Sequence, residues 1–347
     1  MSESFCESYE VDYQALINII REKNASRIFI QAPDGLKKLY RCIGEYITDK
    51  LSDIKIYYSA SPSFGACDIP LEEIEAVKPD LIIHIGHNKY PFLSRKINYD
   101  IIYLPAYYKW KPTNNIINML INEFKKYNVK RIGLVASIQH VHSLEEVAEK
   151  LEEHGYIAYI EKPAYNVMMP GQILGCEYSA ALRIYSKVDL YLVVAGGIFH
   201  ALGLSLIVDK PVIILDPYRL QVINPSSYIK RLKAKRYYVL SKLRNELIRN
   251  AGIIIGSRPG QYRPTLIKYI EKLLEEHGIK YYLFTSTYLS REQLISIDNS
   301  YNLDLYIITS CPRLPIDDFN DFYKPVITPG ELIMVLKNIV EKYVYPW

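Results

Sequence analysis

Three cysteines are the residues of this chain whose type and placement are best suited to chemistry. Each follows a predicted strand in a different third of the sequence: Cys67 in SPSFGACDIP, Cys176 in MMPGQILGCEY and Cys311 in ITSCPRLPIDD. No two cysteines are close enough in sequence to form a local CxxC-type metal clip. If the three share one metal centre, the fold itself must therefore bring them together.

The residues next to these cysteines favour a metal centre that lies close to the protein backbone. Gly65 and Gly175 precede two of them and Pro312 follows the third. Glycine admits a bulky inorganic group near the main chain, and proline rigidifies the exit from the loop. For Cys6 and Cys42 we expect the ordinary role of small buried apolar side chains.

Three thiolates suit either zinc or an iron–sulfur cluster. A structural zinc site with three cysteines normally takes a fourth protein ligand, for which His87 and His200 are candidates. A 4Fe-4S cluster held by three cysteines leaves one iron open, and an open iron can bind the amino and carboxylate groups of a substrate. The residues alone leave both possibilities open.

The elements that would position the cysteines repeat three times along the chain. Each third opens with a strand and a turn, continues with a helix, and adds three further strands. In the second third, the residues from Ser143 to Glu146 predict a capping box at the start of the helix. The opening strand with its turn is predicted at 27–35, 131–140 and 252–261. The further strands are predicted at 54–60, 80–86 and 100–106, then at 156–162, 189–196 and 211–217, and finally at 280–286, 304–310 and 325–330.

The strands are continuous apolar runs, which is typical of parallel strands covered on both faces. Their alternation with helices indicates βαβ units with right-handed crossovers. We therefore predict an α/β fold of three similar doubly wound units, each with about four parallel strands, around a pseudo-threefold axis. The units span 1–106, 107–217 and 218–347. Ligands of such sheets bind beyond the carboxyl ends of the strands, where all three cysteine loops would lie.

Length and composition fit a soluble globular protein of 347 residues, with 49% apolar and 23% charged residues. A net charge of +4 gives no reason to expect nucleic acid or a membrane as partner. Five cysteines do not make a disulfide framework, and the polar, acidic N-terminus does not resemble a signal peptide. We therefore expect a cytoplasmic location.

Two segments need a separate interpretation. The stretch 190–208 carries no charge and approaches the length of a membrane span, but glycines interrupt it, so we predict a buried strand followed by a packed helix. The segment from Lys230 to Arg249 carries eight Lys or Arg residues against Glu246 alone. We expect a helix that joins the second and third units and has a solvated basic face. The alternative is that this face docks an acidic protein substrate.

Six motifs carry a resemblance that extends over nearly the whole chain. They are APDGLKK (32–38), FGACD (64–68), GQILGCEYS (171–179), GGIFHALGL (196–204), RPGQYRP (258–264) and SCPRLPIDD (310–318). With them the chain resembles the archaeal diphthamide synthase iron–sulfur subunit, the 2-(3-amino-3-carboxypropyl)histidine synthase family. The CxxxCxxC motif of ordinary radical enzymes that use S-adenosylmethionine is missing, as it is in this family.

The resemblance implies an activity and its cofactors. Cys67, Cys176 and Cys311 would ligate a 4Fe-4S cluster, and S-adenosylmethionine would bind at the open iron. One electron from the reduced cluster would break the carbon–sulfur bond on the methionine side, with loss of methylthioadenosine. The 3-amino-3-carboxypropyl group would then add to C2 of a histidine on translation elongation factor 2. The family implies a homodimer and an external electron donor.

Further residues at the predicted sheet edge are candidates for binding S-adenosylmethionine. For Gly196 and Gly197 the structural alternative is a tight turn, and for His200 it is a core position. For Asp317 and Asp318, close to Arg313, we favour a structural role in which they cap a helix or hold the arginine. The candidates are Asp34, Gly35, Gly196, Gly197, His200, Gly260, Gln261 and Arg313.

Two other readings of the chain stay open at this point. A quinolinate-synthase-like dehydratase also resembles three α/β units with one cysteine each around a 4Fe-4S cluster. A non-catalytic zinc protein or partner subunit is the second alternative, although the presence of all three cysteines argues against an inactive subunit.

Overall fold

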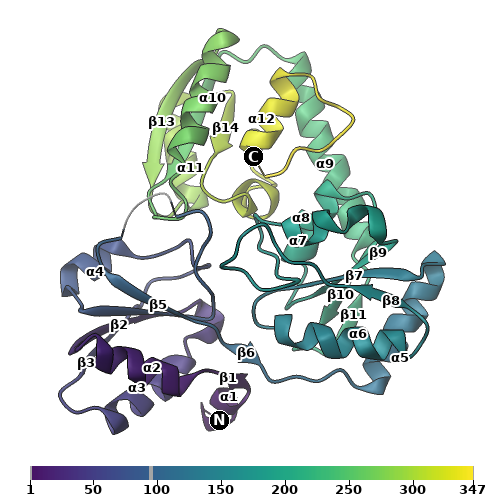
Figure 1. Cartoon of the computed structure of the whole chain (residues 1–347). Coiled ribbons are helices and arrows are strands. Elements are labelled where there is room, and N and C mark those ends of the chain that lie inside the picture. Colours follow the sequence, from purple (N-terminus) through teal and green to yellow (C-terminus); the bar gives the residue numbers. More distant parts are fainter. Residues whose placement is uncertain (1, 94–96, 347) are drawn as a thin grey trace.

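The computed structural model describes residues 2–93 and 97–346 and contains three separate sheets built mainly of parallel strands (Figure 1). The N-terminal helix α1 (Ser2–Glu7) leads into β1 (Tyr9–Glu10), which pairs with β6 (Tyr107–Tyr108) in a small antiparallel ribbon. The three larger sheets form three lobes, and helices lie against their faces (Figure 1).

The first sheet has the order β3-β2-β4-β5, and all its neighbouring strands are parallel. Its central strand β4 is buried at every position, because both faces of the sheet are covered. The elements of this unit are β2 (Arg27–Gln31), α3 (Leu39–Lys50), β3 (Lys55–Tyr58), α4 (Leu71–Val77), β4 (Leu81–Ile85) and β5 (Asp100–Leu104), preceded by α2 (Tyr13–Glu22).

The second sheet has the order β8-β7-β9-β10 with parallel neighbours and an antiparallel edge strand, β11. The edge strand lies beyond residue 217, where the sequence placed the start of the third unit. The elements are α5 (Asn114–Phe124), β7 (Arg131–Ala136), α6 (Leu144–Glu152), β8 (Ile157–Tyr159), α7 (Ser179–Arg183), β9 (Leu190–Val194), α8 (Phe199–Ile207), β10 (Val212–Asp216) and β11 (Gln221–Ile223).

The third sheet has the order β13-β12-β14-β15, again with parallel neighbours. Helix α9 (Ser226–Asn245) connects it to the second unit along one side of the molecule (Figure 1). The other elements are β12 (Asn250–Gly256), α10 (Pro264–Glu276), β13 (Lys280–Ser286), α11 (Arg291–Tyr301), β14 (Leu305–Ile308), β15 (Val326–Ile327) and α12 (Pro329–Leu336), with a π-helical turn, η5 (Leu314–Asp318).

The three units share one strand order: the second strand, then the first, the third and the fourth. The predicted strands are present at their predicted places, which confirms an α/β fold with several parallel sheets.

An aspartate before the third strand of each unit shows the repeat at atomic detail. Asp80 accepts hydrogen bonds from the backbone N–H groups of Ser26 and Arg27, at the start of β2. Asp189 likewise accepts from the backbone N–H groups of residues 130 and 131 at the start of β7. Asp304 accepts from those of residues 249 and 250 at the start of β12. The carboxylate therefore fixes the third strand beside the first, which is why an aspartate precedes this strand in all three units.

This arrangement predicts how the first unit responds to acid. Hydrogen bonds from the backbone of Arg27 and Ser26 lower the pKa of Asp80 to about 2, below the value of about 3.9 for an unfolded chain. The charged carboxylate therefore stabilises the fold above pH 4, and this stabilisation is lost as the pH falls through 2. In denaturant titrations of the cluster-free protein, Asp80→Asn should cost about 1 kcal/mol at pH 7. The gap to wild type should close with acidification, and a constant gap would contradict the assignment.

The second and third units share a continuous apolar core. One cluster of buried side chains contains residues of β9, α8, α9, β12, α10 and α12 together. The first unit has its own cores, centred on β2 and β4. Contacts between the first unit and the other two therefore depend more on the polar loops at the strand ends.

The stretch 190–208 forms strand β9 and helix α8, as predicted. None of the helices in residues 2–93 and 97–346 is both long enough and apolar enough to cross a bilayer.

Two local predictions were wrong. Ser143 does not cap α6, because its backbone already has helical dihedral angles; its hydroxyl donates instead to the carbonyl of His140. Cys6 and Cys42 are not isolated apolar side chains but form a disulfide between α1 and α3. Only the folded chain brings these two cysteines together, since they are 36 residues apart in sequence.

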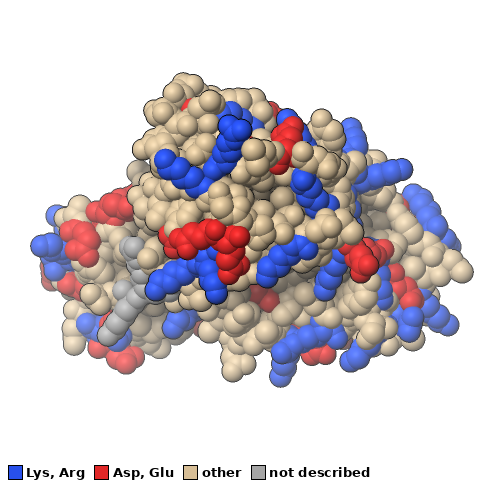
Figure 2. All heavy atoms as spheres, turned by 90° about the horizontal axis from the view of Figure 1, so that it is seen from above, with Lys and Arg blue, Asp and Glu red and all other residues tan. Residues whose placement is uncertain are grey.

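The basic segment is helical, as predicted, but its side chains do not all face solvent. Lys230, Lys235 and Lys242 are exposed, whereas Arg236 is buried against α12 and Arg244 donates to backbone carbonyls of residues 334 and 339. Viewed from the side of the third unit, lysine and arginine side chains are scattered among acidic ones rather than gathered in one patch (Figure 2).

Candidate metal centre

The thiols of Cys67, Cys176 and Cys311 converge in the structure. They lie in the loops that follow β3, β8 and β14, one from each sheet. The thiol of Cys67 interacts electrostatically with both others, and that of Cys311 with Cys176. The three thiols therefore lie near one another, and each is in a loop after the carboxyl end of a parallel strand of its own sheet.

Burial is the main cause of raised pKa values at all three thiols, although each cysteine keeps some solvent-accessible surface. The pKa of Cys311 rises to about 12. A cluster of buried thiols disfavours negative charge in the absence of a cation, so these side chains are suited to a positively charged inorganic partner.

One loop of the third unit holds the cysteine loop of the first. The backbone N–H of Gly260 donates to the carbonyl of Cys67 at 3.0 Å. Two residues earlier, Arg258 forms ion pairs with Asp68 at 3.1 Å and with Glu72 at 3.0 Å. The motif RPGQYRP thus fixes the position of Cys67 across the interface between two units.

Each thiol has a hydrogen-bond donor beside it. The amide of Gln261 lies 3.9 Å from the sulfur of Cys67, and the hydroxyl of Tyr90 lies 3.3 Å from the sulfur of Cys176. The sulfur of Cys311 accepts from the backbone N–H of Arg313. Donors at sulfur stabilise the thiolate form, which is the form that ligates metals.

The donor groups around the thiols are not arranged for a single metal ion. Within residues 2–93 and 97–346, no three His, Cys, Asp or Glu side chains stand close enough to hold one metal ion. A mononuclear zinc site needs sulfur atoms about 2.3 Å from one ion, whereas a cluster of several atoms bridges thiols that are further apart.

The histidines considered as fourth zinc ligands have other surroundings. His87 Nδ1 lies 2.9 Å from Nε2 of His84, and burial lowers the pKa of His87 to about 4. His200 is likewise held neutral, with its pKa lowered to about 4 by burial and then by Arg313. Because both imidazoles are neutral, they add no positive charge beside Arg313.

A cavity of about 720 Å³ opens beside Cys311, between the first and third units. Its lining contains arginines and carboxylates together with an exposed pair of aromatic rings, those of Phe64 and Tyr288, which stack with centroids 6.2 Å apart. A mixed lining of this kind suits a zwitterionic ligand with an aromatic base. The charged residues of the lining are Asp68, Arg258, Arg291, Glu292, Arg313 and Asp318.

Four of the predicted binding residues are grouped around the thiols or the cavity. Gln261 and Arg313 line the cavity. Gly260 packs directly on Cys67, and His200 interacts with Arg313. Arg313 is also paired with Asp317 and Asp318, at 3.4 and 3.7 Å, so these carboxylates hold the arginine as predicted.

The other four predicted residues lie outside the cavity lining. Asp34 is exposed and pairs with Lys37 at 2.7 Å, and Gly35 beside it is exposed. Gly196 packs against the ring of Tyr218, and Gly197 has a φ of +72° and donates its N–H to Asp216. For the last two glycines the structure shows the requirements of a turn.

Residues that the sequence did not single out also surround the thiols. Besides Tyr90, these include Tyr178 and Tyr345, which interact electrostatically with the sulfurs. The hydroxyl of Tyr345 donates to the carbonyl of Gly175 at 3.2 Å. These contacts span up to 170 residues, so local patterns gave no signal for them.

Gly260 offers a test of this packing. A Cβ at this position would lie 2.5 Å from Cα and 2.6 Å from Cβ of Cys67, so Gly260→Ala must displace the cysteine loop. We expect reconstituted protein to lose most of its iron, as measured by iron and sulfide analysis. Gly35→Ala is the matched control, because a Cβ there meets no atom within 4 Å. Equal iron content in both variants would contradict the role of this contact.

Fold and site together define a class: an α/β protein of three parallel sheets with a thiol centre built from one cysteine per sheet. The family model described as "Putative diphthamide synthesis protein" matches residues 32–346, and the chain belongs to this family. The chain is therefore an enzyme, a transferase.

Characterised relatives are similar over nearly their full length. The 2-(3-amino-3-carboxypropyl)histidine synthase of Pyrococcus horikoshii is 28% identical over 337 residues, covering 96% of this chain and 92% of the relative. The enzyme of the same name from Methanocaldococcus jannaschii is 30% identical over 335 residues, with 92% and 88% covered.

Solved structures agree with this assignment. The crystal structure of Dph2 from Pyrococcus horikoshii superposes with a TM-score of 0.81 at 28% identity, covering 96% of this chain and 93% of the other. The structure of the same protein with a 4Fe-4S cluster gives a TM-score of 0.79, with 97% and 93% covered.

Proposed function

We propose that this chain transfers the 3-amino-3-carboxypropyl group of S-adenosylmethionine to C2 of a histidine of translation elongation factor 2, the first step of diphthamide synthesis. The observation that carries the proposal is the convergence of Cys67, Cys176 and Cys311 from three separate sheets. The names of the relatives support the reaction, and the 4Fe-4S cluster of the Pyrococcus horikoshii protein supports the nature of the centre.

Cys67, Cys176 and Cys311 would be the ligands of a 4Fe-4S cluster. When bound, the cluster would supply the electron that cleaves the sulfonium of S-adenosylmethionine. The protein decides which carbon–sulfur bond is cleaved, because the pose of the co-substrate relative to the centre determines which bond is aligned.

The cavity beside Cys311 is our proposed site for S-adenosylmethionine. Arg258 and Arg313 would attract its carboxylate, and Asp68 and Asp318 its ammonium and sulfonium charges. Phe64 and Tyr288 offer ring faces for the adenine. We propose that three further residues next to the thiols or the cavity help to bind the co-substrate: Gln261, Gly260 and His200. Four residues outside the cavity lining stay predictions as binding residues: Asp34, Gly35, Gly196 and Gly197.

The remaining parts of the proposal concern assembly and partners. The common strand order supports an approximate threefold axis that passes through the thiol centre, with units at 1–106, 107–217 and 218–347. We further propose a homodimer that acts in the cytoplasm, receives electrons from an external donor and binds elongation factor 2 as its protein substrate.

Anaerobic incubation of the purified chain with dithionite, isotope-labelled S-adenosylmethionine and elongation factor 2 tests the function. The expected result is a brown protein that bleaches on reduction, release of methylthioadenosine, and a mass gain of one 3-amino-3-carboxypropyl group on one histidine of the factor. Formation of quinolinate from a triose phosphate and iminoaspartate would favour the dehydratase instead. A colourless protein with stoichiometric zinc would overturn the proposal.

A further inference from the structure

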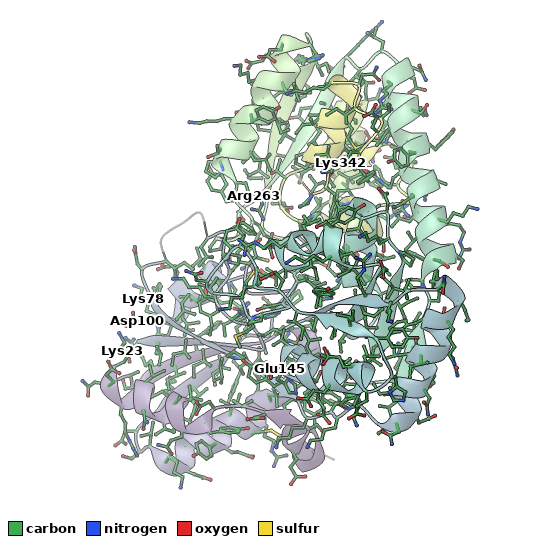
Figure 3. The ribbon with its side chains drawn as sticks, turned by 45° about the vertical axis from the view of Figure 1, so that its right-hand side comes forward. Lys23, Lys78, Asp100, Glu145, Arg263 and Lys342 are labelled. Atoms are coloured by element: carbon green, nitrogen blue, oxygen red, sulfur yellow. A yellow bond between two sulfur atoms is a disulfide. The ribbon has the colours of Figure 1, made fainter. Side chains whose placement is uncertain are left out.

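Tyr90 lies where the three units meet. It follows β4 of the first unit, and its side chain is only 6% exposed. Its hydroxyl is 3.3 Å from the sulfur of Cys176 in the second unit and accepts a hydrogen bond from Arg263 Nη2 of the third unit at 2.9 Å. Figure 3 shows Arg263 on the side of the third unit that faces the other two. The row Arg263, Tyr90, Cys176 therefore connects all three units.

The direction of the hydrogen bonds follows from the chemistry of the three groups. A guanidinium has donors and no acceptor, so the phenol oxygen of Tyr90 must accept from Arg263. The single phenol proton is then available for Cys176. A thiolate that ligates a metal has no proton and can only accept, so Tyr90 is the donor to sulfur.

We propose that Tyr90, oriented by Arg263, is a positioning residue whose hydrogen bond to the ligating sulfur of Cys176 raises the reduction potential of the cluster. The inference rests on the proposed function in one respect, namely that Cys176 ligates a 4Fe-4S cluster. Hydrogen bonds to sulfur withdraw electron density, which stabilises the reduced state relative to the oxidised one. The nearby positive charge of Arg263 also raises the reduction potential.

Among the three donors to sulfur, Tyr90 is the one whose hydrogen bond is strengthened by neighbouring side chains. The contact of Gln261 with Cys67 is longer, at 3.9 Å. The guanidinium of Arg263 polarises the phenol, and such a chain of hydrogen bonds is strengthened in a buried setting. An aromatic side chain also fixes the position of the arginine, since the guanidinium carbon lies 5.5 Å from the ring centroid of Phe92, which in turn packs edge-on against Tyr90.

The test is a redox titration of the reconstituted full-length chain, monitored by electron paramagnetic resonance. We expect Tyr90→Phe to retain its iron and to shift the midpoint potential to more negative values. Tyr103→Phe is the matched control: its hydroxyl is buried and makes no hydrogen bond to the described residues, although Tyr103 interacts electrostatically with Cys67. This control should leave the potential unchanged. A Tyr90→Phe potential equal to that of wild type overturns the inference.

Arg263→Gln is a second variant that does not alter the group next to sulfur. It should shift the potential in the same direction, because it removes a charge that polarises Tyr90 and also acts directly on Cys176. If Tyr90→Phe fails to hold iron, Arg263→Gln decides: a negative shift supports the inference, and an unchanged potential overturns it. The two proposals fail differently. A wild-type chain that binds no cluster ends both, whereas an intact cluster with unshifted potentials in the variants ends only this one.

Discussion

Replacement of Cys176 by alanine should abolish cluster binding and reduce transfer activity below detection. The proposed site has three cysteine ligands, each from the loop of a different sheet, so no neighbouring thiol can substitute for a missing one. Reconstituted Cys176→Ala should be colourless and release no methylthioadenosine. The same holds for Cys67 and Cys311, because each is the sole cysteine that its unit contributes to the centre.

The matched control for these variants is the double change Cys6→Ala with Cys42→Ala. It also removes cysteines, but these form a disulfide between α1 and α3, remote in the chain from the three thiol loops. We expect this protein to load iron as wild type does, with stability reduced by the loss of the cross-link. Normal iron content in Cys176→Ala, with the double variant as reference, would show that Cys176 is not a ligand.

Neutralising Glu331 should strongly destabilise the protein. Arg236 and Glu331 form a bidentate ion pair at 2.7 and 2.5 Å, with both side chains buried. Arg236 also donates to the carbonyls of Pro315 and Val326. Glu331→Gln leaves the guanidinium buried without a compensating charge, which costs about 3–5 kcal/mol. Chemical denaturation of the cluster-free protein measures this loss.

The double variant Arg236→Met with Glu331→Leu separates the charge effect from packing. It removes both charges, so it should be less destabilised than Glu331→Gln alone. Because Arg236 holds the carbonyl of Pro315, just beyond Cys311, Glu331→Gln should also weaken iron retention. Wild-type stability of Glu331→Gln would mean that the pair contributes nothing and that α9 and α12 are held by apolar packing alone.

The buried pair also explains why the basic segment was only partly understood from the sequence. A run of lysines and arginines indicates a solvated face, and most of the lysines of α9 conform to it. Arg236 differs because Glu331, 95 residues later, supplies a carboxylate in the interior. A charge pattern within one helix carries no information about a partner from a distant helix.

The sequence by itself determined the strands, their repetition in three units and the cysteine that each unit contributes. Continuous apolar runs specify buried parallel strands, and the aspartate before each third strand proved to be the acceptor for the start of the first strand. Glycine and proline beside the thiols marked the loops in which they lie. These signals are local, since each is carried by residues that are neighbours along the chain.

The tertiary structure alone decided which side chains surround the thiols. Three contacts join residues from different units or elements. They are the hydrogen bonds from Arg263 through Tyr90 to Cys176, the packing of Gly260 on Cys67, and the disulfide between Cys6 and Cys42. Local sequence could not predict them, because contacts across units depend on how three sheets are oriented toward one another. That orientation is fixed by the sum of many interfacial contacts rather than by the pattern of any single segment.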